Sequence, residues 1–110
     1  MKTTVDRGDL IWIDFDPQAG SEQAGRRPAL VISPRVYNSK SRVIIVCPIT
    51  TKVKGFPFEV MLPAGAAVKG AVLADHIKSM DHAARDLELI GRAPQSVVDE
   101  VLARVAPLVS

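Results

Sequence analysis

Short apolar runs separated by turn-forming residues make up most of this chain. The runs cover residues 10–15, 29–33, 43–49, 56–62, 71–74 and 86–90. Each run is a few residues long and ends at or near a Pro, Gly, Ser or Asn, a pattern typical of consecutive short β-strands. The chain up to Ile90 is therefore predicted to be β.

The run over residues 43–49 differs from the others because its apolar residues are continuous. A strand with apolar residues at every position is predicted to be buried on both faces. Pro48 lies inside this run, and a proline cannot donate a ladder hydrogen bond. We therefore expect Pro48 to mark a sheet edge or a bulge.

The C-terminal segment follows a different period. Apolar residues recur there at helical spacing: Val97, Val98, Val101, Leu102, Val105, Leu108 and Val109. Ser96 with Asp99 three residues later, or Pro94 in the first turn, could begin this helix. Strands followed by one amphipathic helix predict a small, mostly β barrel whose open side the helix covers.

Composition narrows the class of protein. A chain of 110 residues suits one domain, and an apolar content of 47% is too high for intrinsic disorder. The sequence has no apolar run near the roughly 18 residues that a membrane span needs, and its first residues do not resemble a secretory signal. The single cysteine, Cys47, excludes an internal disulfide framework and is expected to be a small buried hydrophobe. We expect a cytoplasmic protein with no membrane contact.

Basic residues are concentrated in the middle of the chain. The stretch from Gln23 to Phe58 contains no Asp or Glu, but it contains Arg26, Arg27, Arg35, Lys40, Arg42, Lys52 and Lys54. Such a stretch can produce a positive surface that attracts polyanions. Alternatively, the fold supplies acids to it from other segments.

Common catalytic and cofactor motifs are absent from the sequence, including the phosphate-binding loop, GxGxxG, HExxH and GxSxG. The nearest approach to a metal motif is Asp75-His76 followed by Asp81-His82. Their spacing suits neither a helix nor a neat strand repeat, so we expect no metal and no cofactor.

The segment over residues 17–28, PQAGSEQAGRRP, is the most distinctive loop. Glu22 lies five residues before Arg27 across a glycine, and Pro28 fixes the far end. A carboxylate and a guanidinium in this arrangement could act as proton acceptor and phosphate clamp on one substrate. A hairpin loop with an incidental surface ion pair would have the same spacing.

Several segments, in order from Arg7 to about Arg85, closely resemble the MazF (PemK/Kid-like) family of mRNA interferase toxins. They read RGDLIWIDFDPQAGSEQAGRRPALVIS, VCPITT, KGFPFEV and LADHIKSMD. The resemblance implies an SH3-like barrel (MazF/CcdB-like) with a terminal helix over residues 1–110. It also implies a homodimer that cleaves single-stranded RNA without a metal, and a MazE-type antitoxin that holds the toxin in check.

The resemblance also assigns residues. The family's catalytic arginine corresponds to Arg27 and not to Arg26, its threonine to Thr50 and its loop glutamate to Glu22. Residues expected to contact RNA are Ser21, Gln23, Arg35, Lys52, Lys54, Phe56, Asp75 and His76, with Lys40, Arg42 and Tyr37 as further possibilities. His76 departs from the family, in which a glutamine follows the acidic residue. The same basic groove would accept the acidic tail of an antitoxin.

The chemistry implied by the resemblance uses the 2′-hydroxyl of the RNA as nucleophile on the adjacent phosphorus. Arg27 suits the developing phosphorane charge because a guanidinium binds two phosphate oxygens at once, and Thr50 can add a neutral hydrogen bond. Glu22 is the candidate base, with His76 as an alternative because imidazole titrates near neutral pH. The expected products carry a 2′,3′-cyclic phosphate and a 5′-hydroxyl.

Other interpretations remain open at this level. A non-catalytic binding module could use the same barrel, as in the related CcdB fold that traps DNA gyrase, and a degenerate toxin could fold and dimerise without cleaving. Trp12 is expected in the core or at a dimer interface. His76 could simply be a packed residue at a strand end.

Overall fold

The computed structural model describes residues 4–15 and 25–110. Its strands are β1 (Asp9–Asp14), β2 (Arg26–Val31), β3 (Val43–Thr50), β4 (Glu59–Met61), β5 (Ala71–Leu73), β6 (Lys78–Asp81) and β7 (Glu88–Arg92). Its helices are the short α1 (Arg35–Asn38), the 3₁₀ turn η1 (His82–Ala84) and the C-terminal α2 (Gln95–Val109). The prediction of a mostly β fold with one C-terminal helix is confirmed.

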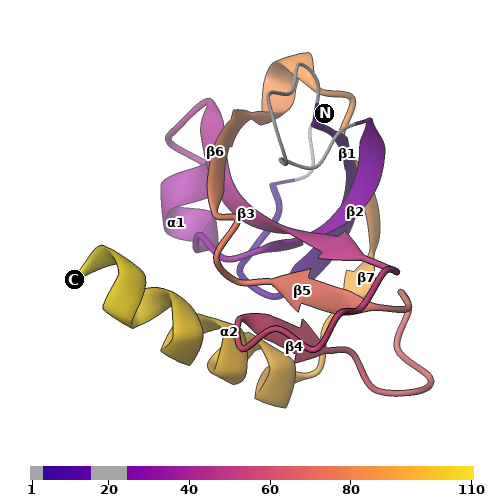
Figure 1. Ribbon diagram of the computed structural model, residues 1–110. Helices are drawn as coiled ribbons and strands as arrows, with labels where there is room; N and C mark the ends of the chain where they lie inside the picture. Colours follow the sequence, from indigo (N-terminus) through magenta and orange to yellow (C-terminus); the bar gives the residue numbers. More distant parts are fainter. Residues whose placement is uncertain (1–3, 16–24) are drawn as a thin grey trace.

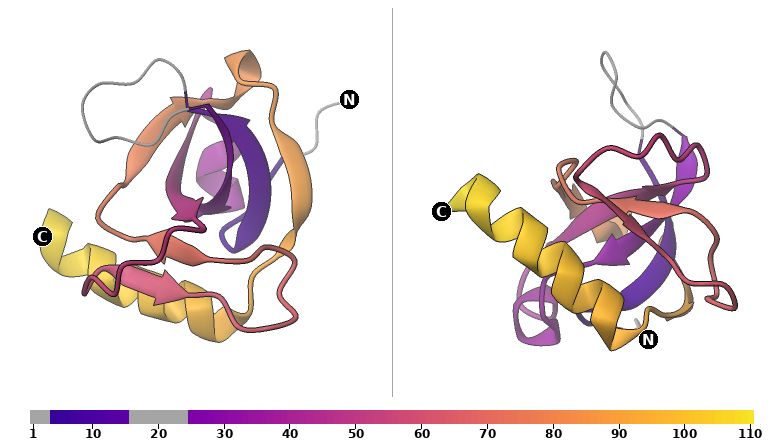
Figure 2. Two further views of the ribbon diagram at one scale, coloured as in Figure 1. Left: turned by 45° about the vertical axis from the view of Figure 1, so that its right-hand side comes forward. Right: turned by 60° about the horizontal axis from the view of Figure 1, so that its bottom comes forward.

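The strands form one antiparallel sheet in the order β4-β5-β3-β2-β1-β7, and β6 pairs with the first half of β3. This sheet curls into an incompletely closed barrel, and α2 lies across it beside β4 and β5 (Figures 1 and 2). A strongly twisted sheet of short strands curls in this way, and one helix then covers the side that the strands leave open.

Two apolar clusters lie on the two faces of the central strands. Alternate residues of β3 belong to different clusters: Cys47 and Ile49 face α2, whereas Ile44 and Val46 face the barrel interior. The cluster beneath α2 includes Leu10, Leu30, Val72, Val97, Val98, Val101 and Val105. The interior cluster includes Ile11, Ile13, Phe15, Ala29, Val31 and Met80. The continuous apolar run of β3 is therefore buried on both faces, as predicted.

Pro48 corrects one expectation, because β3 is a central strand and not an edge strand. On one side Pro48 pairs with Ala29 of β2. On the other side the pairing with β6 ends at Val46 and the pairing with β5 begins at Ile49. Pro48 thus lies where β3 changes partners, a position at which a missing backbone donor is tolerated.

Strand boundaries also differ from the prediction. β2 begins at Arg26 instead of residue 29, so Arg27 is itself a strand residue. Only Glu59–Met61 of the run over residues 56–62 is a strand, and β7 is shifted to Glu88–Arg92. The short elements β6 and α1 were not predicted.

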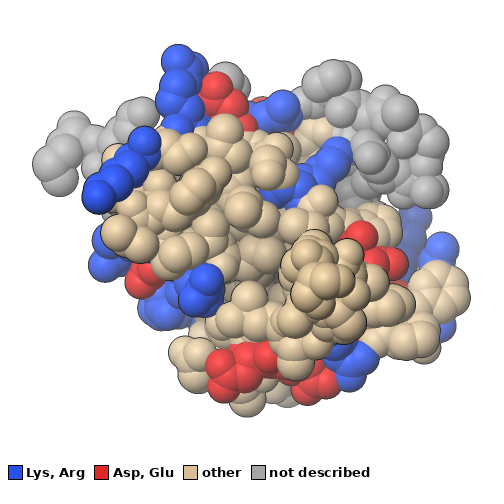
Figure 3. All heavy atoms as spheres, turned by 90° about the vertical axis from the view of Figure 1, so that its left-hand side faces the viewer, with Lys and Arg blue, Asp and Glu red and all other residues tan. Residues whose placement is uncertain are grey.

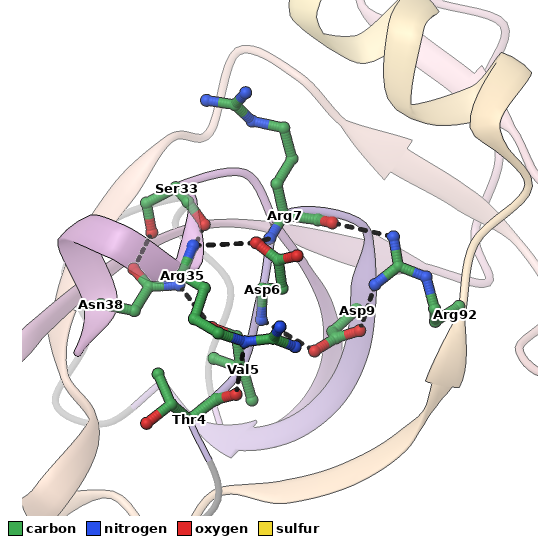
Figure 4. Close-up of polar contacts among 9 residues, drawn as sticks. All are labelled: Thr4, Val5, Asp6, Arg7, Asp9, Ser33, Arg35, Asn38 and Arg92. Carbon is green, nitrogen blue, oxygen red and sulfur yellow. Dashed lines mark hydrogen bonds and ion pairs between the residues drawn. The ribbon is translucent and has the colours of Figure 1, made fainter.

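Polar contacts fasten the N-terminal segment to the barrel (Figure 4). The Asp6 carboxylate accepts hydrogen bonds from the backbone N–H groups of Arg35 and Arg7, both at 2.8 Å. These bonds, that of Arg35 above all, lower the pKa of Asp6. At the other side of the segment, Asp9 pairs with the Arg92 guanidinium at 2.7 Å. The contacts join the first strand to α1 and to the end of β7.

No helix among the described residues has the length and apolar character needed to cross a membrane.

Candidate active site

Arg27 and Thr50 lie on neighbouring strands at the same end of the barrel. Ala29 of β2 pairs with Pro48 of β3. Continuing this antiparallel register toward Arg27 and Thr50 sets those two residues opposite each other. Arg27 is in phase with Ala29 and Val31 of the interior cluster, and Thr50 is in phase with Ile44 and Val46, so both occupy the same face of the two strands. Two of the predicted catalytic residues therefore lie on one face, at the same end of neighbouring strands.

Thr50 is fixed by its surroundings. Only 7% of Thr50 is exposed, and its hydroxyl oxygen accepts the backbone N–H of Lys52 at 3.0 Å. Thr50 also pairs with Ala71 of β5. Because the hydroxyl oxygen already accepts this bond, the hydroxyl proton can be directed toward a substrate.

Gly70 is a positioning residue that the sequence analysis missed. A Cβ atom at Gly70 would lie 2.1 Å from the Thr50 carbonyl oxygen, and the φ angle of Gly70 is +122°. Both facts restrict this position to glycine, because any side chain would push β5 away from Thr50. The available signal was a glycine directly before a predicted strand, which is too common to indicate a site.

Arg26 faces away from Arg27, as strand alternation requires, and it is held by acidic groups. Its guanidinium donates to the Asp86 carbonyl oxygen at 2.8 Å and pairs with Glu88 at 3.2 Å. The carboxylates of Asp14 and Asp86 each lie 3.8 Å from it. Arg26 thus ties β2 to the end of β1 and to the segment before β7. Arg26 therefore has a structural role at this end of the barrel.

Lys52, Lys54 and Phe56 lie on the loop that follows Thr50. Residues 51–57 are all exposed, and Phe56 is 61% exposed. Among residues 4–15 and 25–110, no carboxylate forms an ion pair with the ammonium group of Lys52 or Lys54. The loop therefore carries two exposed cations and an exposed aromatic ring, and it begins directly after Thr50.

Asp75 and His76 occupy the turn between β5 and β6. The His76 backbone N–H donates to the Leu73 carbonyl oxygen, and its Nε2 lies 3.9 Å from an Asp75 carboxylate oxygen. About a third of the His76 side chain is exposed. Thr50 pairs with Ala71, the first residue of β5, whereas this turn follows Leu73, the last residue of β5. His76 and Thr50 therefore lie at different points along the sheet.

Cys47 behaves as the sequence predicts. Its side chain is fully buried beneath α2. Burial, with a smaller contribution from the Asp75 carboxylate, raises the pKa of the Cys47 thiol to about 12. A thiol that stays protonated at neutral pH is a poor nucleophile.

Other predicted RNA contacts lie elsewhere. Arg35 lies on α1, which follows the C-terminal end of β2, whereas Arg27 lies at the N-terminal end of that strand. The Nε of Arg35 donates to the Thr4 carbonyl oxygen at 3.4 Å. Tyr37 lies on the same helix. Glu22, Ser21 and Gln23 are outside the described residues. The residues that flank them are held together, because the Phe15 N–H donates to the Gly25 carbonyl oxygen at 2.9 Å.

The fold neutralises part of the basic stretch. Arg42 pairs with Asp81 at 3.2 Å, and Arg26 has the acidic partners described above. The expectation that acids come from other segments therefore holds for these arginines, whereas the lysines of residues 51–58 stay available to a polyanion. The part of the chain that the structure describes contains no group of three or more His, Cys, Asp or Glu placed to share a metal ion.

Comparisons with known proteins agree with this geometry. The profile of the family described as "PemK-like, MazF-like toxin of type II toxin-antitoxin system" matches residues 6–109. The chain is 45% identical to the endoribonuclease toxin MazF of Escherichia coli K12 over 104 residues, which is 94% of this chain and 93% of that protein.

Solved structures show the same fold. MazF of Deinococcus radiodurans superposes with a TM-score of 0.93 at 48% identity and covers 97% of both chains. A MazE–MazF structure from the same organism superposes with a TM-score of 0.87 at 48% identity, covering 97% of this chain and 96% of the other. The shared fold and the family match over nearly the whole sequence lead to one conclusion: this chain belongs to the PemK/MazF toxin family of type II toxin–antitoxin systems.

Proposed function

We propose that this protein is a metal-independent, sequence-specific endoribonuclease that cleaves single-stranded RNA, mRNA above all, as the toxin of a type II toxin–antitoxin pair. The observation that carries the proposal is the β2–β3 register, whose continuation sets Arg27 opposite Thr50, just before an exposed loop with Lys52 and Lys54. The endoribonuclease name of its relative, similar over most of the chain, supports it. We also propose that residues 1–110 form one toxin domain.

In the proposed reaction, the 2′-hydroxyl attacks the adjacent phosphorus and the 5′-oxygen of the next nucleotide leaves. The Arg27 guanidinium binds two phosphate oxygens and stabilises the charge that develops on them. The Thr50 hydroxyl accepts a hydrogen bond from the Lys52 N–H and donates a hydrogen bond to the same phosphate. The products are a 2′,3′-cyclic phosphate and a 5′-hydroxyl end.

Proton transfer requires a base for the 2′-hydroxyl and an acid for the leaving oxygen. Glu22 is the proposed base, because it belongs to the loop whose flanking residues meet beside Arg27. His76 is the alternative, since its ring is partly exposed beside Asp75. Ser21, Gln23, Phe56 and Asp75 are proposed to contact the RNA. The reaction uses no cofactor.

Two protein partners are proposed. A MazE-type antitoxin would lay an acidic tail in the RNA groove, and the MazE–MazF structure of a relative supports such a partner. A second copy of the chain would form a homodimer. In support, α1 and the C-terminal end of α2 share a face that is largely neither acidic nor basic at its centre (Figure 3). Exposed Val36, Tyr37, Leu108 and Val109 belong to these helices. Because mRNA is the proposed substrate, we place the activity in the cytoplasm.

The proposal is tested by incubating the protein with a pool of single-stranded RNA in EDTA and sequencing the new 5′ ends. We expect cleavage at a short recurring motif. Absence of cuts over all sequences, in EDTA and in a parallel reaction with Mg²⁺, would exclude a nuclease and favour the alternative, a non-catalytic binding module on the same barrel.

A further inference from the structure

The loop over residues 51–58 is exposed at its surface but anchored at both ends. At its start, the Lys52 N–H donates to Thr50 Oγ1. At its end, the Glu59 carboxylate turns back to the loop and accepts the N–H groups of Lys54 and Gly55, the latter at 2.8 Å. The Glu59 N–H also donates to the Phe56 carbonyl oxygen at 3.1 Å.

Two consecutive backbone N–H groups directed at one anion form a concave anion site. Here that site is made by Lys54 and Gly55, and Gly55 has a φ of +79°, in the left-handed region. The occupant is the carboxylate of Glu59, and hydrogen bonds to a charged acceptor are stronger than neutral ones. The carboxylate therefore fixes the backbone from which the Lys54 and Phe56 side chains project.

The rest of the loop is fastened to the body of the protein. Phe58 packs against the apolar cluster beneath α2, and Arg104 of α2 donates to the Pro57 carbonyl oxygen. Lys54 and Gly55 lie between these anchors, and their backbone is not held by Thr50, Phe58 or Arg104. Among the described residues, the carboxylate of Glu59 is the side-chain group that bonds to the backbone there.

We propose that Glu59 is a positioning residue for the substrate: its carboxylate holds the loop in the conformation that presents Lys54 and Phe56 to single-stranded RNA. The inference rests on the proposed function and extends it to a residue that does not itself contact RNA. A loop ordered before binding loses less conformational entropy when RNA binds, so it gives higher affinity.

The sign of the effect separates this role from simple electrostatics. Removal of a negative charge beside an RNA-binding loop weakens repulsion and, by itself, tightens RNA binding. If Glu59 positions the loop, Glu59→Ala instead weakens binding. Asp99→Ala is the matched control, because Asp99 is also an acidic residue but bonds to the Gln95 side chain on α2 and not to the loop.

The experiment measures three quantities in the wild-type protein, Glu59→Ala, Glu59→Gln and Asp99→Ala. They are hydrogen exchange of the Lys54 and Gly55 amides, the Kd for a 2′-O-methylated single-stranded RNA, and the cleavage rate at saturating RNA. Thermal unfolding verifies that each variant folds.

In Glu59→Ala we expect loss of amide protection and a Kd raised about tenfold, the scale of one charge-assisted hydrogen bond. The saturated cleavage rate should change less than about twofold, because the chemical groups are untouched. Glu59→Gln should recover part of both losses, since its amide oxygen still accepts a hydrogen bond. Asp99→Ala should match the wild type.

An unchanged or lower Kd in Glu59→Ala, or amides that keep their protection, would overturn the positioning role while leaving the nuclease in place. A wild-type protein that binds RNA without cleaving it would contradict the proposed function alone. A wild-type protein that neither binds nor cleaves RNA would overturn both.

Discussion

Arg26 and Arg27 are neighbours in sequence but occupy opposite faces of β2, and this separates their expected roles. Arg26 is held by Glu88 and the Asp86 carbonyl oxygen, whereas continuation of the β2–β3 register sets Arg27 opposite Thr50. We expect Arg27→Ala to lower cleavage by about 100-fold or more with the fold intact, the scale for losing one charge-stabilising donor. Arg26→Ala should be much milder. Cleavage rates and circular dichroism measure both, and equal losses would mean that the wrong arginine is assigned.

The family resemblance implies a glutamine at the position of His76, whose side chain is partly exposed. A histidine and a glutamine both offer a donor and an acceptor, but at different positions. If His76 contacts a base, His76→Gln should change which RNA sites are cut more than it changes the rate at a shared site. If His76 moves a proton, the rate should fall at every site and the pH–rate curve should lose a limb.

Sequencing of cleavage sites and pH–rate curves for the two proteins decide between these roles for His76. Identical cleavage maps together with identical curves would show that the residue only packs in the turn between β5 and β6.

Asp6 has a lowered pKa because its carboxylate accepts backbone N–H groups, that of Arg35 first. A carboxyl group whose pKa falls on folding stabilises the protein above its unfolded pKa, and this stability is lost as the pH drops through the folded value. The difference in unfolding free energy between wild type and Asp6→Asn should therefore be full above about pH 5. It should shrink toward pH 2, and it should stay below about 1.5 kcal/mol because the group is partly exposed. Denaturant titrations at several pH values measure this, and a constant difference would contradict it.

Single residues were predictable from sequence where a motif or a strong apolar context defined them. Cys47 lies within a continuous apolar run, so its burial followed directly. Gly70 and Glu59 were not predictable, because their roles depend on contacts with Thr50 and with the backbone of a loop. Such contacts between a side chain and a distant or irregular backbone leave no periodic pattern in the sequence.

At the scale of elements, the loop between β3 and β4 is the expected contact for the RNA backbone. Each phosphate contact on single-stranded RNA contributes about 0.7 to the magnitude of the negative slope of log affinity against log salt concentration. Reversing Lys52 and Lys54 to Glu should therefore weaken binding and flatten that slope. The control reverses Lys40 and Arg42, which lie before β3 at the end of that strand opposite to Thr50.

Filter binding of single-stranded RNA over a series of salt concentrations measures these slopes. If the loop reversal leaves the slope unchanged, or if the control flattens it equally, the RNA groove lies elsewhere on the protein.

Helices and strands were predicted more accurately when they are long and their apolar residues repeat with a clear period. α2 was predictable because its apolar positions, Val97, Val98, Val101 and Val105, repeat over several turns and pack on the sheet. β6 and α1 are four residues each, too short for a period to emerge. β2 begins at Arg26 because pairing with β1 extends it, so tertiary structure and not local propensity fixes its start.

At the scale of the whole molecule, the architecture was predictable from the order of its parts. Strands first and a packing helix last leave few arrangements. The continuous apolar run over residues 43–49 predicted a strand buried on both faces, and β3 indeed separates two apolar clusters. The site itself was not predictable from periodicity, because the position of Arg27 relative to Thr50 depends on the β2–β3 register. Resemblance to a known family supplied those residues.

The ends of the RNA fragments test the central claim most directly, because attack by the 2′-hydroxyl leaves distinctive termini. The wild-type protein is incubated with one cleavable single-stranded RNA in EDTA, and the products are analysed by mass spectrometry. We predict a 2′,3′-cyclic phosphate on the upstream fragment and a 5′-hydroxyl on the downstream fragment. A 5′-phosphate with a 3′-hydroxyl, or cleavage that EDTA abolishes, would contradict the mechanism assigned to Arg27 and Thr50.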